Sequence, residues 1–333
     1  MEATQPTQRR FATDTLTIAL VVLLLLCASA AVSACGGTST TASPSAAPSV
    51  TARSPSATPS PTASSRGTIA FTRQSKRSQD IYVMRSDGTG LRRLAKDAQG
   101  PAWSPDGSRI AYTKGGDVHV MNADGSGQRL VTRALAAGWA AMVAWSPGGT
   151  RIVFSEGGDL LVVNTDGSGL RYVSAASSRV SGYHPAWAPS GRILFGRGSS
   201  NLYEICSVDP DARRSRVATV TKTPPISSSF SLSRDGSWLA ISQSDADRLL
   251  RMPADGPGAA VVLLDEVSRY LARGASVLTS WSPDGSEIAF GNDSQGWRVV
   301  GVTSSLYIAT ADGSHVWKVP NTAGAYDPAW RPE

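Results

Sequence analysis

The chain has 333 residues, enough for one large domain or two ordinary ones, and 41% of them are hydrophobic, which is enough apolar material for a packed core. Its 32 glycines and 20 prolines suit a turn-rich fold better than a helical one. The net charge of +6 comes from scattered lysines and arginines in runs no longer than two, so the charge gives no basis for a nucleic-acid partner.

The first 34 residues have the layout of a secretory signal peptide. Arg9 and Arg10 precede an apolar run over residues 16–27, and small residues follow, ending in Val-Ser-Ala-Cys at 32–35. This tetrad resembles the lipobox of bacterial lipoproteins, which implies acylation of Cys35 and a domain on the extracytoplasmic side of the cell membrane. Residues 16–34 also approach the length of a membrane-spanning helix, about 20 residues, so an uncleaved helix is the alternative.

Residues 35–65 are expected to be a lipidated cysteine followed by a disordered tether. Serine, threonine, alanine and proline dominate the segment, and Arg53 is its one charged residue. Such a composition cannot bury enough apolar area to offset the entropy lost on ordering. With Cys27 removed in the signal peptide and Cys35 acylated, only Cys206 is left, so no intramolecular disulfide is expected.

From residue 66 onward one phrase, PAWSPDG in its first complete copy, returns at nearly constant spacing. Its six copies are separated by steps of 42, 42, 45, 49 and 49 residues. A second phrase alternates with it, an apolar run followed by a turn, as in DVHVMNADGSG at residues 117–127. The landmark positions of the first phrase are Trp103, Trp145, Trp187, Leu232, Trp281 and Trp330.

Each repeat of about 44 residues therefore holds four short β-rich runs. We name them A (ending at the landmark), B (the IAFT-type run), C (before the Asp-Gly turn) and D (after that turn). Ser-Pro-Asp-Gly between A and B is a turn signal, because proline fixes φ, aspartate bonds local backbone and glycine accepts a positive φ. A small four-stranded sheet can bury both faces only against copies of itself, which is typical of a propeller blade.

The two ends of the repeat region predict how the ring closes. The first B strand, RGTIAFT from Arg66, has no A strand before it, and the last A strand, PAWRPE, has no B strand after it. We therefore expect an all-β, six-bladed β-propeller of four-stranded blades over residues 66–333, closed by the C-terminal strand joining the first blade. Closure of this kind removes the open sheet edges.

The phrases PAWSPDG, RIAYT and VHVMNADGSG resemble the repeats of the TolB-type β-propellers, a WD40-like repeat family, over all six units. The resemblance implies that strand A is innermost and that its start faces the channel mouth. TolB also has an N-terminal α/β domain, where this chain has the tether. Peptidases with the same repeat need a hydrolase domain with a G-x-S-x-G motif, and this sequence contains none.

Two residues at the start of the A strands are candidates for a ligand site. His184 stands three residues before its landmark and Asp327 stands three before its own, and each follows a tyrosine, Tyr183 or Tyr326. Their repeats are the third and the sixth of six, so they face each other across the axis. We expect a polar site at the channel mouth; the alternative is that these residues only make a water-filled channel polar.

The D–A and B–C connections vary in length. They lie together on the face of the ring opposite the one that carries the repeated A–B and C–D turns. Variable loops on a rigid scaffold commonly carry binding residues. Aromatic residues and arginine are the types enriched among interface anchors. The candidates of these types on the variable loops are Trp139, Arg179, Arg269, Tyr270, Trp297 and Arg298.

The remaining polar groups predict no metal or cofactor. Each Asp-Gly turn offers one aspartate, which fits a hairpin better than a calcium loop. His119 and His315 lack the spacing of a zinc site, and we expect them to be surface or packing residues. Cys206 occupies a C-strand position that is apolar in every other repeat, so we expect a buried thiol.

The sequence thus favours a non-enzymatic, lipid-anchored envelope protein with a monomeric domain. It would bind a protein or cell-wall partner through the loop-variable face and the channel mouth. Two alternatives stay open: a metal-dependent propeller enzyme of the lyase or lactonase type, and a receptor for a sugar or another small molecule at the mouth.

Overall fold

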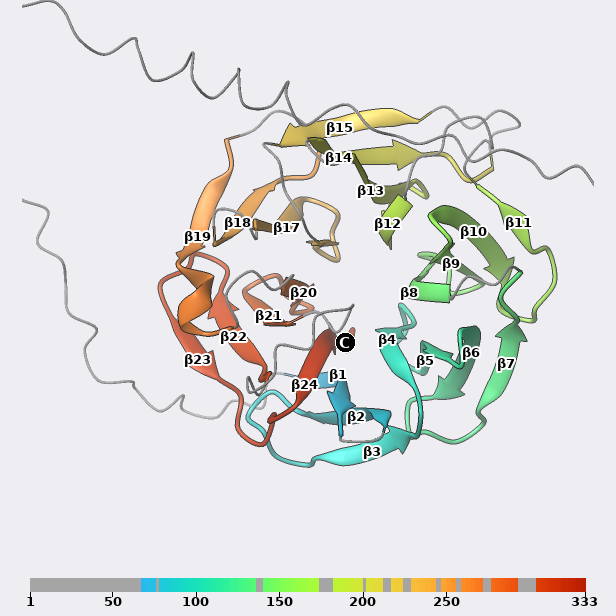
Figure 1. Cartoon of the computed structure of the whole chain (residues 1–333), viewed down its shortest axis with the longest axis horizontal. Helices are drawn as coiled ribbons and strands as arrows, with labels where there is room; N and C mark the ends of the chain where they lie inside the picture. Colours follow the sequence, from blue (N-terminus) through green and yellow to red (C-terminus); the bar gives the residue numbers. More distant parts are fainter. Residues whose placement is uncertain are drawn as a thin grey trace, which may run out of the picture. The chain divides into compact units, whose positions relative to one another are not determined.

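The structure is a computed structural model of the whole chain. It describes residues 67–75, 78–135, 140–173, 182–199, 202–211, 217–223, 229–243, 247–255, 259–271, 277–292 and 304–333. These residues form six antiparallel four-stranded sheets arranged as the blades of a propeller, which confirms the predicted fold (Figure 1). Within these ranges, no helix has both the length and the apolar composition needed to cross a membrane.

The strands follow the predicted A-to-D order in every blade, counted from the axis outward. The innermost strands are β24 (Ala325–Trp330), β4 (Gln99–Trp103), β8 (Ala140–Trp145), β12 (Gly182–Trp187), β16 (Phe230–Leu232) and β20 (Val277–Trp281). The B strands are β1 (Thr68–Gln74), β5 (Arg109–Lys114), β9 (Arg151–Glu156), β13 (Ile193–Ser199), β17 (Trp238–Gln243) and β21 (Glu287–Asn292).

The C strands are β2 (Gln79–Arg85), β6 (Asp117–Asn122), β10 (Asp159–Asn164), β14 (Leu202–Val208), β18 (Arg248–Pro253) and β22 (Tyr307–Thr310). The outermost strands are β3 (Arg92–Ala95), β7 (Arg129–Thr132), β11 (Arg171–Tyr172), β15 (Ala218–Thr223), β19 (Val261–Asp265) and β23 (Val316–Lys318). A short 3-10 helix, η1 (Val267–Arg269), follows β19.

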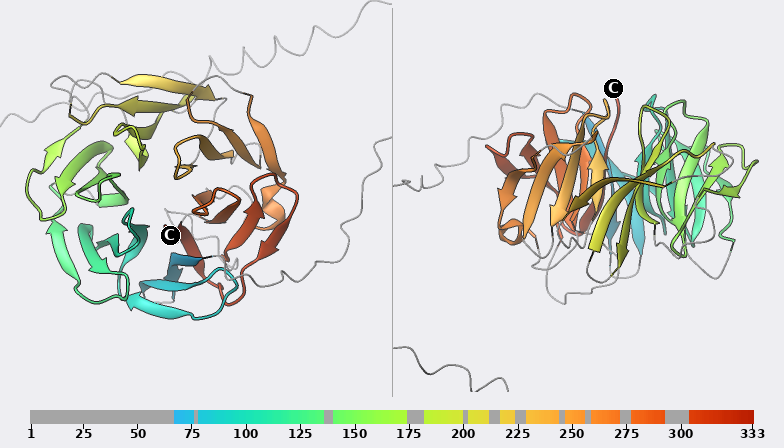
Figure 2. Two further views of the ribbon diagram at one scale, coloured as in Figure 1. Left: turned by 180° about the vertical axis from the view of Figure 1, so that it is seen from behind. Right: turned by 90° about the horizontal axis from the view of Figure 1, so that it is seen from above.

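The first blade is completed by the last strand of the chain. Its strand order is β24-β1-β2-β3, and Ile69 of β1 pairs with Trp330 of β24. The chain end lies on the face that carries the A–B turns, and the ring is seen edge-on in Figure 2. The predicted closure by the C-terminal strand is therefore confirmed.

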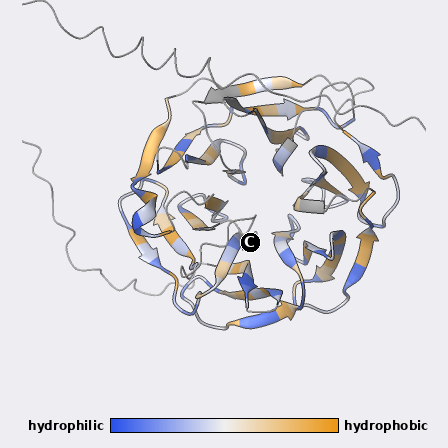
Figure 3. Cartoon of the chain, viewed as in Figure 1, coloured by the Kyte–Doolittle hydropathy of each residue, from blue (hydrophilic) through white to orange (hydrophobic). Residues whose placement is uncertain are grey.

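The core of the protein lies between blades. The middle strands are buried on both sides, as in β5, where Ile110, Ala111 and Tyr112 have no exposed surface. Figure 3 shows the hydrophobic colour along most of β10, one of these middle strands. Residues of adjacent blades share each cluster; Val118 of the second blade, for example, belongs with Phe154 of the third. This explains the unbroken apolar runs, because a strand covered on both faces has no polar side.

Hydrogen bonds within the repeated A–B turn explain its Ser-Pro-Asp-Gly sequence. In the first copy the Ser104 hydroxyl donates to the Asp106 carboxylate at 2.6 Å, and the Ser108 amide and hydroxyl donate to the same group. The amide of Gly107 donates to the Ser104 carbonyl at 2.8 Å, and Gly107 has φ 64°. These bonds lower the pKa of Asp106 to about 2, since they favour its charged form.

The repeated tryptophan and arginine connect one blade to the next. The indole Nε1 of Trp145 donates to the Ala102 carbonyl of the preceding blade at 2.9 Å. The guanidinium of Arg109, also on the preceding blade, lies 4.8 Å from the centroid of the Trp145 ring, within the range of a cation–π contact. The fifth blade has Leu232 in place of the tryptophan. Arg192 of the fourth blade, which corresponds to Arg109, therefore donates to the Ser207 hydroxyl of its own blade at 3.0 Å.

The other predicted packing residues behave as expected. Cys206 is fully buried, and this burial raises the pKa of its thiol. His119 stacks on Tyr112 with ring centroids 5.5 Å apart, and His315 is exposed after its turn.

We expect removal of residues 325–333 to open the ring. The deletion uncovers one edge of β1 and the apolar surface against which Ala325, Tyr326 and Trp330 are buried. Loss of the Trp330 side chain alone is expected to cost about 3 kcal/mol, which corresponds to a fall in Tm of about 10 °C. Circular dichroism melts measure this, with deletion of the exposed Glu333 alone as control; equal Tm values would contradict closure as a stabilising feature.

Acid should weaken the A–B turns. Because the folded-state pKa of Asp106 lies below its ordinary value of about 4, the turn contributes stability above pH 4 and loses it as the pH falls toward 2. We expect Asp106→Asn to be less stable than the wild type at pH 7, with the difference shrinking as the pH approaches 2. Melting temperatures at several pH values test this, and a difference that does not change with pH would show that the charge is irrelevant.

Candidate functional site

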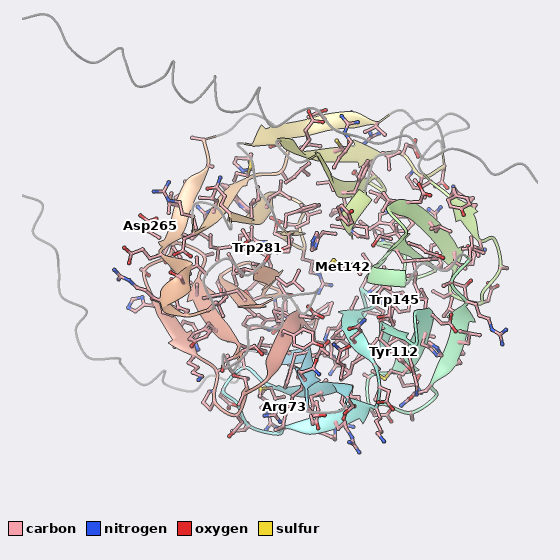
Figure 4. All side chains as sticks on the ribbon, in the orientation of Figure 1. Arg73, Tyr112, Met142, Trp145, Asp265 and Trp281 are labelled. Carbon is pink, nitrogen blue, oxygen red and sulfur yellow. The ribbon has the colours of Figure 1, made fainter. Side chains whose placement is uncertain are left out.

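The six innermost strands surround a central channel of about 540 Å³. A volume of this size matches the pockets that take small ligands. Its wall is largely apolar, with landmark tryptophans and the prolines of the A–B turns. Figure 4 shows Met142 beside this channel and Asp265 at the outer rim of the ring. The channel is therefore the candidate site around which the predicted residues can be placed.

Four innermost strands carry a β-bulge at the same position, three residues before the landmark. In β12, for example, His184 and Pro185 together oppose one residue of β13. The bulge residues are Gly100, Met142, His184 and Asp327, with φ of 61°, 47°, 52° and 51°. In β16 and β20 the ladders run without a register shift.

The left-handed conformation at these bulges favours glycine. For other residues it costs about 1–2 kcal/mol, because Cβ comes too close to the backbone. The second blade has glycine here, whereas three blades have methionine, histidine and aspartate. All four residues line the channel. Strained backbone held by ordered ladders on both sides is found preferentially at binding and catalytic sites.

His184 is uncharged at neutral pH. It is half-buried in the channel wall, and its removal from water lowers the pKa of the imidazole to about 4. A neutral imidazole offers one hydrogen-bond donor and one acceptor. The ring can therefore bind a polar ligand group without adding a positive charge to the channel.

Asp327 lies on the opposite side of the channel from His184, in the first blade. The Thr72 hydroxyl donates to Asp327 Oδ2 over 3.4 Å and accepts a hydrogen bond from the Gly100 amide at 3.0 Å. Thr72 is fully buried, so it fixes the position of the carboxylate relative to the bulge of the next blade. The structure thus brings the predicted histidine and aspartate to one channel.

The two tyrosines that precede these residues have different surroundings. Tyr183 is 46% exposed, whereas Tyr326 is 3% exposed. The neighbouring blade passes close to Tyr326, since a Cβ on Gly291 would lie 3.7 Å from the Tyr326 Cα. Of the two, Tyr183 is the one accessible to a partner.

The candidates on the variable loops divide into three groups. Tyr270 is half-buried and packs against Phe290 and Tyr307, with centroids 6.2 and 5.4 Å away, so it supports β21 and β22. Arg269 is exposed and forms an ion pair with Glu266. Trp139, Arg179, Trp297 and Arg298 lie outside the described residues, as does Cys35.

The sequence analysis missed one residue at the other end of the channel. Arg234 of the fifth blade occupies a turn position that is proline in the other five copies. Its Nη1 donates to a main-chain carboxylate oxygen of Glu333 at 3.3 Å and its Nη2 to the Pro105 carbonyl of the opposite blade at 3.4 Å. The replacement of proline by arginine at this one turn position was the feature of the sequence that could have indicated Arg234. The turn forms without proline, since the Gly236 amide still donates to the Ser233 carbonyl at 2.9 Å.

Metal ligands do not cluster in the part of the chain that the structure describes. No group of three or more histidine, cysteine, aspartate or glutamate side chains lies close enough there to hold an ion. The aspartates of the C–D turns bond their own turns, as Asp124 does with the Ser126 amide at 2.9 Å.

Comparisons with known proteins identify the fold. No protein-family model and no curated protein matches the sequence. TolB from Acinetobacter baumannii is 18% identical, with a TM-score of 0.63 over 80% of this chain and 67% of that one. A chain of a nidogen–laminin complex is 13% identical, with a TM-score of 0.61 over 80% and 98%. A TolB-like protein from Agrobacterium tumefaciens is 15% identical, with a TM-score of 0.58 over 79% and 91%. The fold of the described residues is therefore a six-bladed β-propeller similar to those of the TolB proteins.

Proposed function

We propose that this chain is a binding protein of the bacterial cell envelope that takes a protein or cell-wall partner at its channel mouth. The observation that carries the proposal is the shared left-handed conformation of Met142, His184 and Asp327 around one channel. The fold does not require these side chains, because Gly100 occupies the same position in the second blade. Three residues other than glycine hold this unfavourable conformation and present three different chemical groups to one channel. Recognition of a ligand best explains why they are retained.

The position of the mouth also supports binding of a partner. The bulges lie at the start of the A strands, on the face that carries the variable D–A connections. The opposite mouth is bridged by Arg234, so a partner approaches from the variable face. The exposed Tyr183 lies beside His184 at this approach and is the type of residue that anchors protein interfaces.

The location in the envelope is supported by the N-terminal sequence. The signal layout over residues 1–34 and the lipobox-like VSAC place the proposed anchor at Cys35. Residues 36–65 would then form a tether between the membrane and the propeller. A monomeric propeller on such a tether can search the space near the membrane for its partner.

A photo-cross-linker at Tyr183 should capture the partner. We expect a discrete cross-linked product in intact cells of the natural host when the full chain carries benzoylphenylalanine at residue 183. The matched control places it at Tyr172, which is 54% exposed but lies on the outer strand β11. Identical product patterns from the two positions would contradict a specific site at the channel mouth.

The anchor is tested at Cys35. We expect the wild type to incorporate labelled fatty acid, and Cys35→Ala to remain unlabelled while its propeller still folds. The measurement is metabolic labelling followed by membrane fractionation. An unlabelled wild type that stays in the membrane after a carbonate wash would instead support the uncleaved helix over residues 16–34.

A further inference from the structure

The channel wall carries hydroxyl groups on one side only, at the level of the residue before each landmark. That residue is half-buried and lines the channel in all six blades. It is alanine in four of them, whereas the fifth and sixth blades have Ser231 and Ser280. Thr279, which precedes Ser280, lines the channel as well. Two adjacent blades therefore place three hydroxyl groups on one side of the channel.

The three hydroxyl groups keep hydrogen-bonding capacity for a ligand. Ser231 Oγ and Thr279 Oγ1 lie 2.7 Å apart, so one hydroxyl donates to the other and the accepting hydroxyl still has its own hydrogen. Ser280 Oγ accepts a hydrogen bond from the Trp330 amide at 2.9 Å, and its own hydrogen has no acceptor among the described residues. Because a hydroxyl group is both a donor and an acceptor, this side can donate to oxygen atoms of a ligand.

His184 of the fourth blade extends this side of the wall toward the variable face. It lies on the blade next to the fifth, two residues farther from its landmark than the serines, or roughly 7 Å along a strand. Its imidazole has no hydrogen-bond partner among the described residues. The ring is neutral at pH 7, since burial lowers its pKa to about 4, and so it offers one donor and one acceptor. We call Ser231, Thr279, Ser280 and His184 the polar wall.

The side of the channel opposite the hydroxyl groups is apolar. The second and third blades lie across the axis from the fifth and sixth (Figure 1). Near the level of the hydroxyl groups they line the channel with Pro101, Ala102, Val143 and Ala144. Hydrocarbon gains free energy by leaving water for such a surface. A ligand that fills the channel therefore meets hydroxyl groups on one side and hydrocarbon on the other.

The ionised side chains that line the described part of the channel are bonded within the protein. Asp327 accepts a hydrogen bond from the Thr72 hydroxyl, and Arg234 donates to two main-chain oxygen atoms. An ion entering the channel would lose its hydration, and it would meet no uncommitted charge of opposite sign among the described residues. The channel therefore favours a neutral ligand over a charged one.

We propose that the channel binds a neutral sugar, with its hydroxyl groups against the polar wall and its C–H groups against Pro101 and Val143. This inference rests on the proposed function, because it names the chemical group through which a cell-wall partner enters the channel. Sugar hydroxyls both donate and accept, as do serine, threonine and a neutral imidazole, so the two sets can pair without any charge. The C–H groups of the sugar ring gain free energy at the apolar side.

Titration with three probes that each contain a six-membered ring tests the inference. Methyl glucoside, methyl glucuronide and cyclohexanol are added separately to the purified full chain at pH 7, in a detergent without sugar headgroups. The fluorescence of the tryptophans that line the channel is followed. The glucuronide adds a carboxylate to the sugar, and cyclohexanol keeps a single hydroxyl group. We expect methyl glucoside to bind about tenfold more tightly than either of the others.

The matched variants are the double substitution Ser231→Ala with Thr279→Val and the single substitution Thr132→Val. The double variant removes the bonded pair of hydroxyls, and valine keeps the β-branched shape that suits a strand. Thr132 is half-buried on the outermost strand β7, away from the channel. We expect the double variant to weaken binding of methyl glucoside about tenfold and Thr132→Val to leave it within about twofold.

A third variant, His184→Gly, tests the other end of the polar wall. Glycine accepts the left-handed conformation of residue 184, so the bulge is expected to persist while the imidazole is lost. We expect this variant also to bind methyl glucoside about tenfold more weakly. Its result stands independently if the double variant fails to fold.

Three outcomes would overturn the inference. Binding of the glucuronide or of cyclohexanol that equals that of methyl glucoside would exclude a neutral sugar and leave the channel as a partner site. Unchanged binding in variants that melt at the temperature of the wild type would exclude the polar wall. If no probe gives a saturable response, the sugar site is wrong, and cross-linking from Tyr183 still reports separately on a protein partner at the mouth.

Discussion

Each blade has two apolar faces, and only the neighbouring blades can cover them. The middle strands are buried on both sides, and every cluster of the core draws residues from two adjacent blades. A ring in which only five of the six blade–blade interfaces had formed would leave two apolar blade faces in water. The ring is therefore stable only when it is closed. This requirement explains why the last strand of the chain belongs to the first blade.

Residues of the repeated phrase hold adjacent blades together by hydrogen bonds and cation–π contacts as well as by burial of apolar area. Trp145 donates a hydrogen bond to the carbonyl of Ala102, and Arg109 covers its ring from the same neighbouring blade. Trp103 does the same with the carbonyl of Ala329 and the guanidinium of Arg331 across the closure. These contacts fix the positions of β4 and β8 against the preceding blades, and a fixed innermost strand can hold a residue in an unfavourable backbone conformation.

The channel site depends on that rigidity. His184 and Asp327 remain in left-handed conformations because the ladders resume on both sides of each bulge. Thr72 links the Asp327 carboxylate to the backbone of Gly100 in the next blade, so the geometry of one wall is shared between blades. Exchange of only these bulge residues changes the chemical groups that line the channel and leaves the interfaces that hold the ring together unchanged.

The sequence by itself determined the number of blades, the order of strands and the mode of closure. These follow from local signals, a period near 44 residues and turns such as Ser104–Gly107, which act within a few neighbouring residues. It also placed His184 and Asp327 in opposite repeats, because position in a ring can be counted along the chain.

Only the tertiary structure decided what surrounds each side chain. Tyr183 and Tyr326 occupy equivalent positions in sequence, yet Tyr183 is exposed and Tyr326 is buried close to the sixth blade. Tyr270 has the composition of an interface anchor but packs on Phe290, and Arg234 reaches the opposite blade across the axis. Such contacts join residues that are distant along the chain, so no local pattern specifies them.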